Sequence, residues 1–249
     1  MAPDLLTPDW PAPPNVRALQ TLRPGGCSAA PWDSFNLGDH VGDDPARVAA
    51  NRAALRRHLP AEPLWLQQVH GIAAVDAGKT ANSGSGVVAD AAFAGQPDVV
   101  CAVMTADCLP VLFCDQAGSV VAAAHAGWRG LLGGILESTL VGMAVPAAEL
   151  LAWLGPAIGP QAFEVGDEVR TAFLADDPAA ATAFVALGAG KWLADLYALA
   201  RRRLLRAGVQ QIYGGGECTL SDRARYFSYR RDGITGRMAT LIWLAGDSV

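Results

Sequence analysis

Three apolar runs between residues 98 and 126 constrain the fold of this chain more than any other feature. The segment reads DVVCAVMTADCLPVLFCDQAGSVVAAAHA, with a polar break after the first run and a QAG turn after the second. Short apolar runs bounded by turns predict strands, and runs without polar alternation are typical of strands that are buried on both faces. We therefore expect a sheet covered on both sides, in a mixed α/β fold.

Helix-like and strand-like segments alternate along the rest of the chain. The clearest helix pattern spans residues 191–208, where Leu193, Leu196, Leu199 and Leu204 mark one face and Gly208 ends the pattern. Further helices are predicted at 45–59 with Asp44 as the cap, at 129–143 and at 166–177. The predicted strands are 16–23, 64–70, 72–77, 150–159, 210–216 and 237–245. One mixed α/β domain, residues 1–249, accounts for this alternation.

Three polar or glycine-rich stretches are predicted to be loops. Residues 23–44 are rich in Gly, Asp and Pro, and ordered loops of this length are often functional. The stretch ANSGSGVVADAAFAGQ at 81–96 is small and polar, and it is predicted to be a surface loop. Residues 225–236, RYFSYRRDGITG, form an aromatic and cationic loop in this prediction.

Charge and cysteine content exclude several classes of protein. The net charge is −5 and no basic run occurs, which argues against a nucleic-acid or membrane partner. The amino terminus does not resemble a signal peptide, and no apolar run reaches membrane-spanning length. Five cysteines without a CxxC pair are typical of a reducing compartment, with Cys101 and Cys114 as core residues. We expect a cytoplasmic protein that is a monomer or a small homo-oligomer.

His70, Cys108 and His125 each stand where an apolar stretch meets a glycine, a proline or a loop. Strand ends present side chains rigidly into a shared crevice. Two imidazoles and one thiolate form a suitable three-ligand set for catalytic zinc, which leaves a fourth position open. Cys108 and His125 fall at the ends of neighbouring predicted strands, whereas spacing alone does not bring His70 beside them.

Other interpretations of these residues stay open at this point. Each histidine taken alone fits a hydrogen-bonded core or loop residue, and Cys108 fits a buried thiol or a nucleophile paired with His125. A blue-copper site also uses two histidines and one cysteine. A multicopper cluster, however, needs on the order of ten histidine ligands. The chain has 4 histidines, so zinc is favoured, with adventitious copper as the alternative.

Several segments resemble one known family, in order and over nearly the full length. They include QVHG, TADCLPVL, AHAGWRGLLGG, GPAIGP, FEVGDEV and FSYRRDGITGRMA. The chain resembles the YfiH-like, laccase-domain family, also named multicopper polyphenol oxidases. The resemblance implies an α/β architecture with helices outside layered mixed sheets, similar to that of cysteine hydrolases. It also implies that His70, Cys108 and His125 are zinc ligands.

The resemblance further implies a purine nucleoside phosphorylase. Phosphate would cleave adenosine, inosine, guanosine or methylthioadenosine to the free base and ribose 1-phosphate, with adenosine deamination as a side activity. The zinc deaminase signature, H-x-E with P-C-x-x-C, is absent, so deamination would need a differently placed acid or base. A Cys–His amide hydrolase that edits peptidoglycan precursors and a nucleoside-binding module are the alternatives; a copper polyphenol oxidase is disfavoured.

Phosphorolysis requires a cation for phosphate. Arg129 follows the predicted ligand His125 closely, and Arg230 and Arg231 lie in the cationic loop. The planar guanidinium group binds two oxygens of one anion, which suits phosphate. We predict that Arg129 and one of the two loop arginines contact substrate.

A purine pocket requires a flat apolar surface and polar groups beside it. Phe35 and Tyr229 lie in polar loops and are the predicted stacking residues, and Asn36 is a predicted substrate contact. For His40, local capping is favoured over metal binding. Asp107 adjoins Cys108 but should point away from it, which favours a structural carboxylate.

Overall fold

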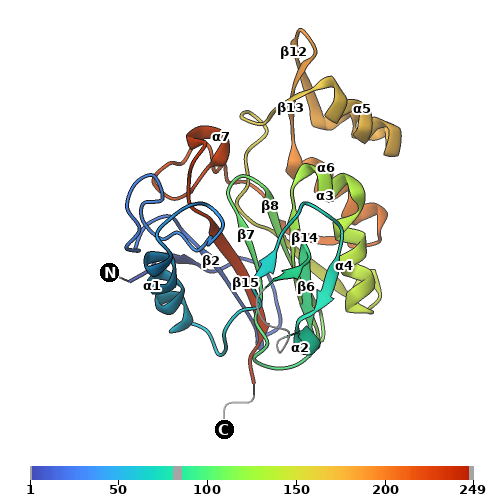
Figure 1. The fold of residues 1–249 in the computed structure, drawn as a ribbon. Coiled ribbons are helices and arrows are strands. Elements are labelled where there is room, and N and C mark those ends of the chain that lie inside the picture. Colours follow the sequence, from blue (N-terminus) through green and yellow to red (C-terminus); the bar gives the residue numbers. More distant parts are fainter. Residues whose placement is uncertain (1, 81–85, 247–249) are drawn as a thin grey trace.

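The computed structural model describes residues 2–80 and 86–246, and two sheets lie at its centre (Figure 1). The larger sheet contains, in spatial order, β14 (Gln211–Gly214), β10 (Leu150–Leu154), β8 (Leu109–Asp115), β9 (Val121–Ala126), β6 (Ala91–Ala94) and β4 (Ala74–Asp76). The smaller contains β1 (Leu5–Leu6), β2 (Val16–Thr21), β15 (Met238–Leu244) and β7 (Cys101–Thr105). Both antiparallel and parallel pairs occur in the larger sheet, which confirms the predicted mixed α/β class.

The two faces of the central strands explain their continuous apolar runs. Every residue of β7, β8 and β9 is buried, as the sequence predicts. Along β8, Val111 and Phe113 pack toward the helices, whereas Leu112 and Cys114 pack between the two sheets. Burial of each such side chain contributes about 1.5–3 kcal/mol. A strand that is covered on both sides has no solvent face on which polar residues would alternate.

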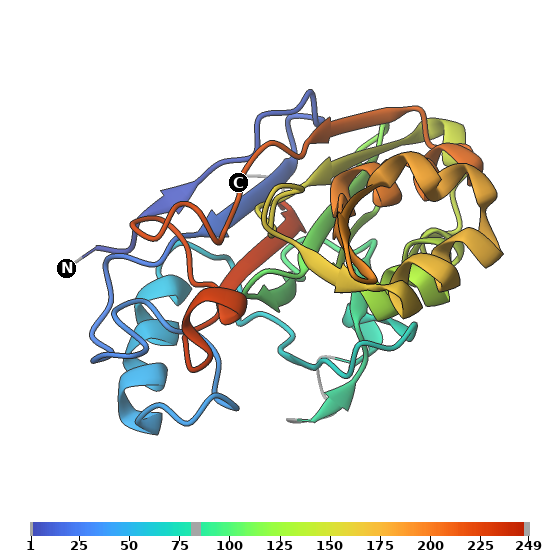
Figure 2. The same ribbon diagram turned by 90° about the horizontal axis from the view of Figure 1, so that it is seen from above.

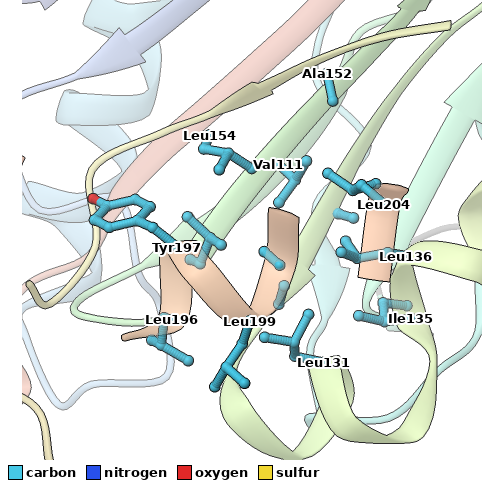
Figure 3. Close-up of a cluster of buried hydrophobic side chains, with 14 of the residues drawn as sticks. Val111, Leu131, Ile135, Leu136, Ala152, Leu154, Leu196, Tyr197, Leu199 and Leu204 are labelled. Carbon is cyan, nitrogen blue, oxygen red and sulfur yellow. The ribbon is translucent and has the colours of Figure 1, made fainter. Parts of the chain in front are cut away.

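Helices cover the outer faces of both sheets, so the predicted layering is confirmed. The helix α1 (Pro45–Arg56), with Asp44 as its cap, packs Leu55 onto the smaller sheet. The larger sheet is covered by α3 (Trp128–Gly133), α4 (Ile135–Met143) and α6 (Leu196–Arg206). Figure 3 shows Leu204 of α6 near Val111 of this sheet, and Leu199 near Leu131 of α3. In Figure 2, α1 and the orange α6 lie on opposite sides of the paired sheets.

The segment 191–208 differs from its prediction as one long helix. Residues Lys191–Ala194 form β13, which pairs with β11 (Glu164–Gly166) and β12 (Phe184–Gly188), and α6 begins only after Asp195. The Asp195 carboxylate accepts a hydrogen bond from the N–H of Ala198, so it caps the helix at this position. Leu193 therefore belongs to a strand. With α5 (Asp167–Asp176), this small sheet forms the lobe at the top of Figure 1.

Other predicted elements are shorter or divided. The predicted helix at 129–143 is broken at Gly134, whose φ of 103° lies in the left-handed region. The predicted strands 64–70 and 72–77 contain only β3 (Leu66–Gln67) and β4, which lie in different sheets. The predicted loop at 225–236 contains the short helix α7 (Tyr229–Asp232).

The stretch 81–96 was predicted to be a surface loop, and this prediction is wrong for its second half. It contains β5 (Val87–Val88), which pairs with β3, and the buried strand β6. Residues 81–85 lie outside the described residues. The remaining short elements are α2 (Ala77–Thr80) and two 3₁₀ turns, η1 (Ala147–Glu149) and η2 (Pro178–Ala183). Among the described residues, no helix is long and apolar enough to cross a bilayer.

Candidate metal centre

His70, Cys108 and His125 come together at one end of the two facing sheets. One ligand atom from each residue lies within 4.8 Å of the other two. The Cys108 Sγ is 3.6 Å from Nε2 of His70, and the two imidazole rings meet edge to face with centroids 4.8 Å apart. The fold thus brings His70 next to Cys108 and His125, which the spacing of these residues in the sequence did not predict.

The strand pairing explains the position of two of these residues. Leu109 of β8 pairs with Ala126 of β9, so Cys108, just before β8, lies at the end of β9 that carries His125. His125 has the same parity along β9 as Val121 and Ala123, which face the space between the sheets. His125 is only 3 % exposed, so its imidazole is enclosed at the mouth of that space.

A buried carboxylate connects the third residue to the other two. Asp90, fully buried before β6, accepts a hydrogen bond from Nδ1 of His125 at 2.8 Å. It also accepts hydrogen bonds from the backbone N–H groups of Val69, His70 and Gly71. The carboxylate therefore holds the turn that carries His70. Because Nδ1 of His125 faces Asp90, Nε2 is the nitrogen left for a metal ion.

The His70 turn is also tied to the smaller sheet. The Gln68 side chain donates to the carbonyl of Met104 at 2.8 Å and accepts from the N–H of Met104 at 2.7 Å. His70 itself has a φ of 60°, a left-handed conformation that is uncommon for a residue with a side chain. Such a conformation persists only where the surrounding structure enforces it, here through Asp90 and Gln68.

The charges of Cys108 and His125 depend on each other. Burial favours the neutral thiol, but the positive charge of His125 and hydrogen bonds from both histidines lower the pKa of Cys108 to about 6. Burial disfavours the imidazolium, but the Cys108 thiolate and the Asp90 carboxylate raise the pKa of His125 to about 9. At neutral pH the metal-free pair is therefore a thiolate beside an imidazolium, and a metal ion would displace the proton.

Close approach of the three side chains requires a glycine next to them. A Cβ atom at Gly127 would lie 2.7 Å from Cδ2 of His70 and 2.9 Å from Sγ of Cys108. The donor set, two imidazole nitrogens and one thiolate sulfur, is one that zinc accepts with a fourth position open. The residues therefore fit a metal ion, and the identity of that ion stays a prediction.

The predicted substrate residues are not all placed where substrate contact requires. Phe35 is fully buried in the core beside Leu37 and Leu55, so its prediction as a stacking residue is wrong. Asn36 is also fully buried, and its amide is occupied by Gly38, Asp43 and the N–H of Arg237. Polar loop composition did not reveal that this loop folds back into the core.

Arg129, Arg230 and Tyr229 lie at the surface, whereas Arg231 is partly buried. Arg129 is exposed, with its guanidinium 4.3 Å from the Trp128 ring centroid. Arg230 is exposed and donates to the carbonyl of Glu164. Arg231 is the structural member of the loop pair, because its guanidinium bonds Asp232 and three backbone carbonyls. Tyr229 is 60 % exposed, and the guanidinium carbon of Arg237 lies 5.9 Å from its ring centroid.

Asp107 has the structural role that the sequence predicts. Its carboxylate accepts hydrogen bonds from the hydroxyls of Thr219 and Ser228 and from the N–H of Arg230. The residues of this site that sequence reasoning missed are Asp90 and Gln68. The one available signal was an acid inside the apolar run VVADAAFA.

A large cavity lies beside Gln68, and none of the three clustered residues is among its lining residues. Its volume is about 850 Å³, and its lining includes Gln68, Met104, His40, Arg52 and Trp65. Gln68 lies two residues before His70, so one end of the cavity adjoins the turn that carries this histidine. Cavities of this size accommodate small organic ligands.

A family model and named relatives match this sequence. Residues 17–245 match the family described as multi-copper polyphenol oxidoreductase laccase. A Pseudomonas aeruginosa protein named purine nucleoside phosphorylase is 56 % identical over 240 residues, which are 96 % of this chain and 98 % of the relative. Purine nucleoside phosphorylase YfiH of Escherichia coli is 54 % identical over 242 residues, with the same two coverages.

Solved structures have the same fold. The crystal structure of Neisseria meningitidis protein NMB0706 matches with a TM-score of 0.94 at 55 % identity, covering 97 % of this chain and 99 % of that one. YlmD from Geobacillus stearothermophilus matches with a TM-score of 0.87 at 31 % identity, covering 94 % and 93 %.

Proposed function

This chain belongs to the family described as multi-copper polyphenol oxidoreductase laccase, and we propose that it is a zinc-dependent purine nucleoside phosphorylase. The observation that carries this function is the His70–Cys108–His125 cluster, in a chain more than half identical to two relatives named for that activity. The substrates are adenosine, inosine, guanosine and methylthioadenosine, together with phosphate. Deamination of adenosine is a side activity.

In phosphorolysis an oxygen of phosphate forms a bond to C1′ of the ribose while the bond from C1′ to the base breaks. The base leaves with the electron pair and takes up a proton. A zinc ion held by His70, Cys108 and His125 would act as a Lewis acid that stabilises negative charge. Because Asp90 occupies Nδ1 of His125, Nε2 is left as the nitrogen that would hold the ion, and the exposed ring of Tyr229 offers a stacking surface for the purine.

Zinc is favoured over a multicopper centre because the chain has too few histidines for several copper ions. Two histidines and a cysteine also suit a single copper, and copper binds such ligands more strongly, so adventitious copper is expected in some preparations. The chain has 4 histidines in all, and His40 and His58 are exposed residues outside the cluster. A multicopper oxidase centre needs on the order of ten histidines, so polyphenol oxidation is disfavoured.

The location follows from cysteine chemistry. All five cysteines are free thiols, including the exposed Cys27, which is typical of a reducing compartment. We propose a cytoplasmic location on this basis, and a monomer or a small homo-oligomer stays a prediction.

The test incubates zinc-loaded protein with adenosine in the presence and absence of phosphate, and separates the products by chromatography. Adenine and ribose 1-phosphate that form only with phosphate support phosphorolysis, and inosine supports deamination. The Cys108→Ala variant should lose both zinc and phosphorolysis, whereas the matched Cys27→Ala variant should keep them. Unchanged adenosine under all conditions would contradict the proposed activity.

A second function is suggested by the thiolate. Cys108, His125 and Asp90 form a nucleophile, a base and an orienting carboxylate, which is the arrangement of a cysteine amide hydrolase. Peptidoglycan precursors would be the substrates of such an enzyme. Removal of the metal by a chelator separates the two functions, because a cysteine hydrolase stays active without metal and the zinc phosphorylase does not.

A further inference from the structure

Arg237 is a positively charged residue beside the metal centre that the sequence did not single out. It directly precedes β15, whose first residue, Met238, pairs with Thr105 of β7. One residue beyond this strand pair, Arg237 therefore lies at the end of β7 that leads into Asp107 and Cys108. The negative charges of these two residues act on Arg237 and oppose the effect of burial, which lowers its pKa. Arginine nevertheless remains protonated in proteins.

The guanidinium of Arg237 is only partly occupied. Its Nη1 donates to the carbonyls of Thr235 and Gly236, both at 3.1 Å. Its Nε and Nη2 make no hydrogen bond with the described residues, and neither atom is shut off from solvent. These two N–H groups form one edge of the guanidinium plane. Such an edge matches two oxygens of one anion.

Arg237 also differs from two other arginines of this region in having no carboxylate partner. Arg23 pairs with Asp33 and Asp232, and Arg52 pairs with Asp39. Within residues 2–80 and 86–246, Arg237 makes no ion pair. A partly buried charge without an ion-pair partner is costly, and an anion bound at the free edge of the Arg237 guanidinium would offset this cost.

The backbone around Arg237 fixes the position of this side chain. The buried amide oxygen of Asn36 accepts from the N–H of Arg237 at 2.9 Å, and the N–H of Leu37 donates to its carbonyl at 3.1 Å. Gly38 leaves room for the side chain, because a Cβ there would lie 2.8 Å from Cγ of Arg237. Asn36, which was predicted to bind substrate, thus holds the backbone of Arg237 in place instead.

We propose that the Nε–Nη2 edge of Arg237 binds inorganic phosphate, the second substrate of the proposed reaction. The inference rests on the proposed function for the identity of the anion. Arg237 would hold two phosphate oxygens next to the metal centre and lower the repulsion between phosphate and the Cys108 thiolate. Arg129 and Arg230, which the sequence favoured for this role, are exposed and have no such enclosure.

The kinetic test compares Arg237→Met and Arg237→Lys with the wild-type enzyme, all loaded with zinc. Loss of two charge-assisted hydrogen bonds should raise the KM for phosphate roughly 10- to 100-fold in Arg237→Met, with little change in the KM for the nucleoside. Arg237→Lys keeps the charge but not the fork, so a smaller rise is expected. Arg206→Met, an exposed arginine of α6 that pairs with Asp176, is the matched control. Equal KM values for phosphate in wild type and Arg237→Met would overturn the inference.

Direct binding separates this inference from the proposed function. Titration of the zinc-loaded proteins with inorganic phosphate by calorimetry should give binding to wild type and Arg206→Met but not to Arg237→Met. If wild type binds phosphate through Arg237 yet cleaves no nucleoside, the proposed reaction fails and the phosphate site stands. If wild type binds no phosphate, or Arg237→Met binds it equally well, the site is wrong. Arg237→Lys should be weaker than wild type, and equal affinity would exclude the two-oxygen contact.

Discussion

The carboxylate of Asp90 and the imidazole of His125 are joined by a hydrogen bond of 2.8 Å that is almost completely enclosed by protein. The same carboxylate receives the backbone N–H of His70 at 2.9 Å. One buried acid therefore orients one predicted ligand through its side chain and another through its main chain. Carboxylates that support metal-binding histidines in this way raise the basicity of the ring and fix its tautomer.

Asp90→Asn should weaken metal binding. The amide keeps the size of the side chain but removes the charge that supports His125, so the affinity for zinc should fall roughly 10- to 100-fold. The measurement is a competition with a chromophoric chelator. Asp115→Asn is the matched control, because Asp115 is also buried but binds only its own turn at Ser119 and Val120. Equal loss of zinc affinity in both variants would show that general destabilisation, not Asp90, is responsible.

Gly127→Ala should damage the metal centre without straining the backbone. Gly127 has φ −62° and ψ 156°, which alanine adopts freely, but its new methyl group would collide with His70 and Cys108. Because ligands must be held within about 0.5 Å, zinc affinity should fall about tenfold or more. Zinc content is measured by mass spectrometry together with Tm. Gly216→Ala, which has open space around its Cβ, should retain zinc. Full zinc content in Gly127→Ala would mean that the side chains can move apart at little cost.

The sequence predicted the central strands correctly because their signal is local. Buried runs with turns between them specify β7, β8 and β9, and the cap at Asp44 specifies the start of α1. The segment 191–208 failed because leucines at helical spacing also fit a short strand followed by a helix. Only the pairing of β13 with β11 and β12 decides between the two, and this pairing is a tertiary effect.

The site could be predicted only in part for a related reason. The chemistry of His70, Cys108 and His125 is visible in the residue types, whereas their proximity depends on Asp90 and Gln68, which hold the His70 turn. Hydrogen bonds between residues far apart in the chain leave no pattern in a single sequence. Loop composition likewise did not distinguish the buried Phe35 from the exposed Tyr229.

Asp195→Ala should destabilise the fold by removing the cap of α6. The carboxylate accepts from the N–H of Ala198, and loss of such a cap costs about 1 kcal/mol. The free energy of unfolding in urea measures the change. Lys191→Ala in β13 is the comparison, since its exposed ion pair with Glu164 is worth little. If Asp195→Ala and Lys191→Ala have the same free energy of unfolding, α6 does not depend on this cap.

Asp232 should make stability sensitive to acid. Burial disfavours its carboxylate, but hydrogen bonds and charge from Arg231, with the charges of Arg223 and Arg23, lower its pKa. A carboxyl whose pKa is lower in the folded state stabilises the fold above its unfolded pKa of about 3.9 and loses this contribution as pH falls through the folded value. Wild type should therefore be more stable than Asp232→Asn at neutral pH, and the difference should shrink between about pH 5 and about pH 2. Thermal unfolding of both proteins across this range, at constant ionic strength, measures the difference. A gap in Tm that stays constant down to the lowest pH would mean that the ion pairs of Asp232 do not contribute to folding.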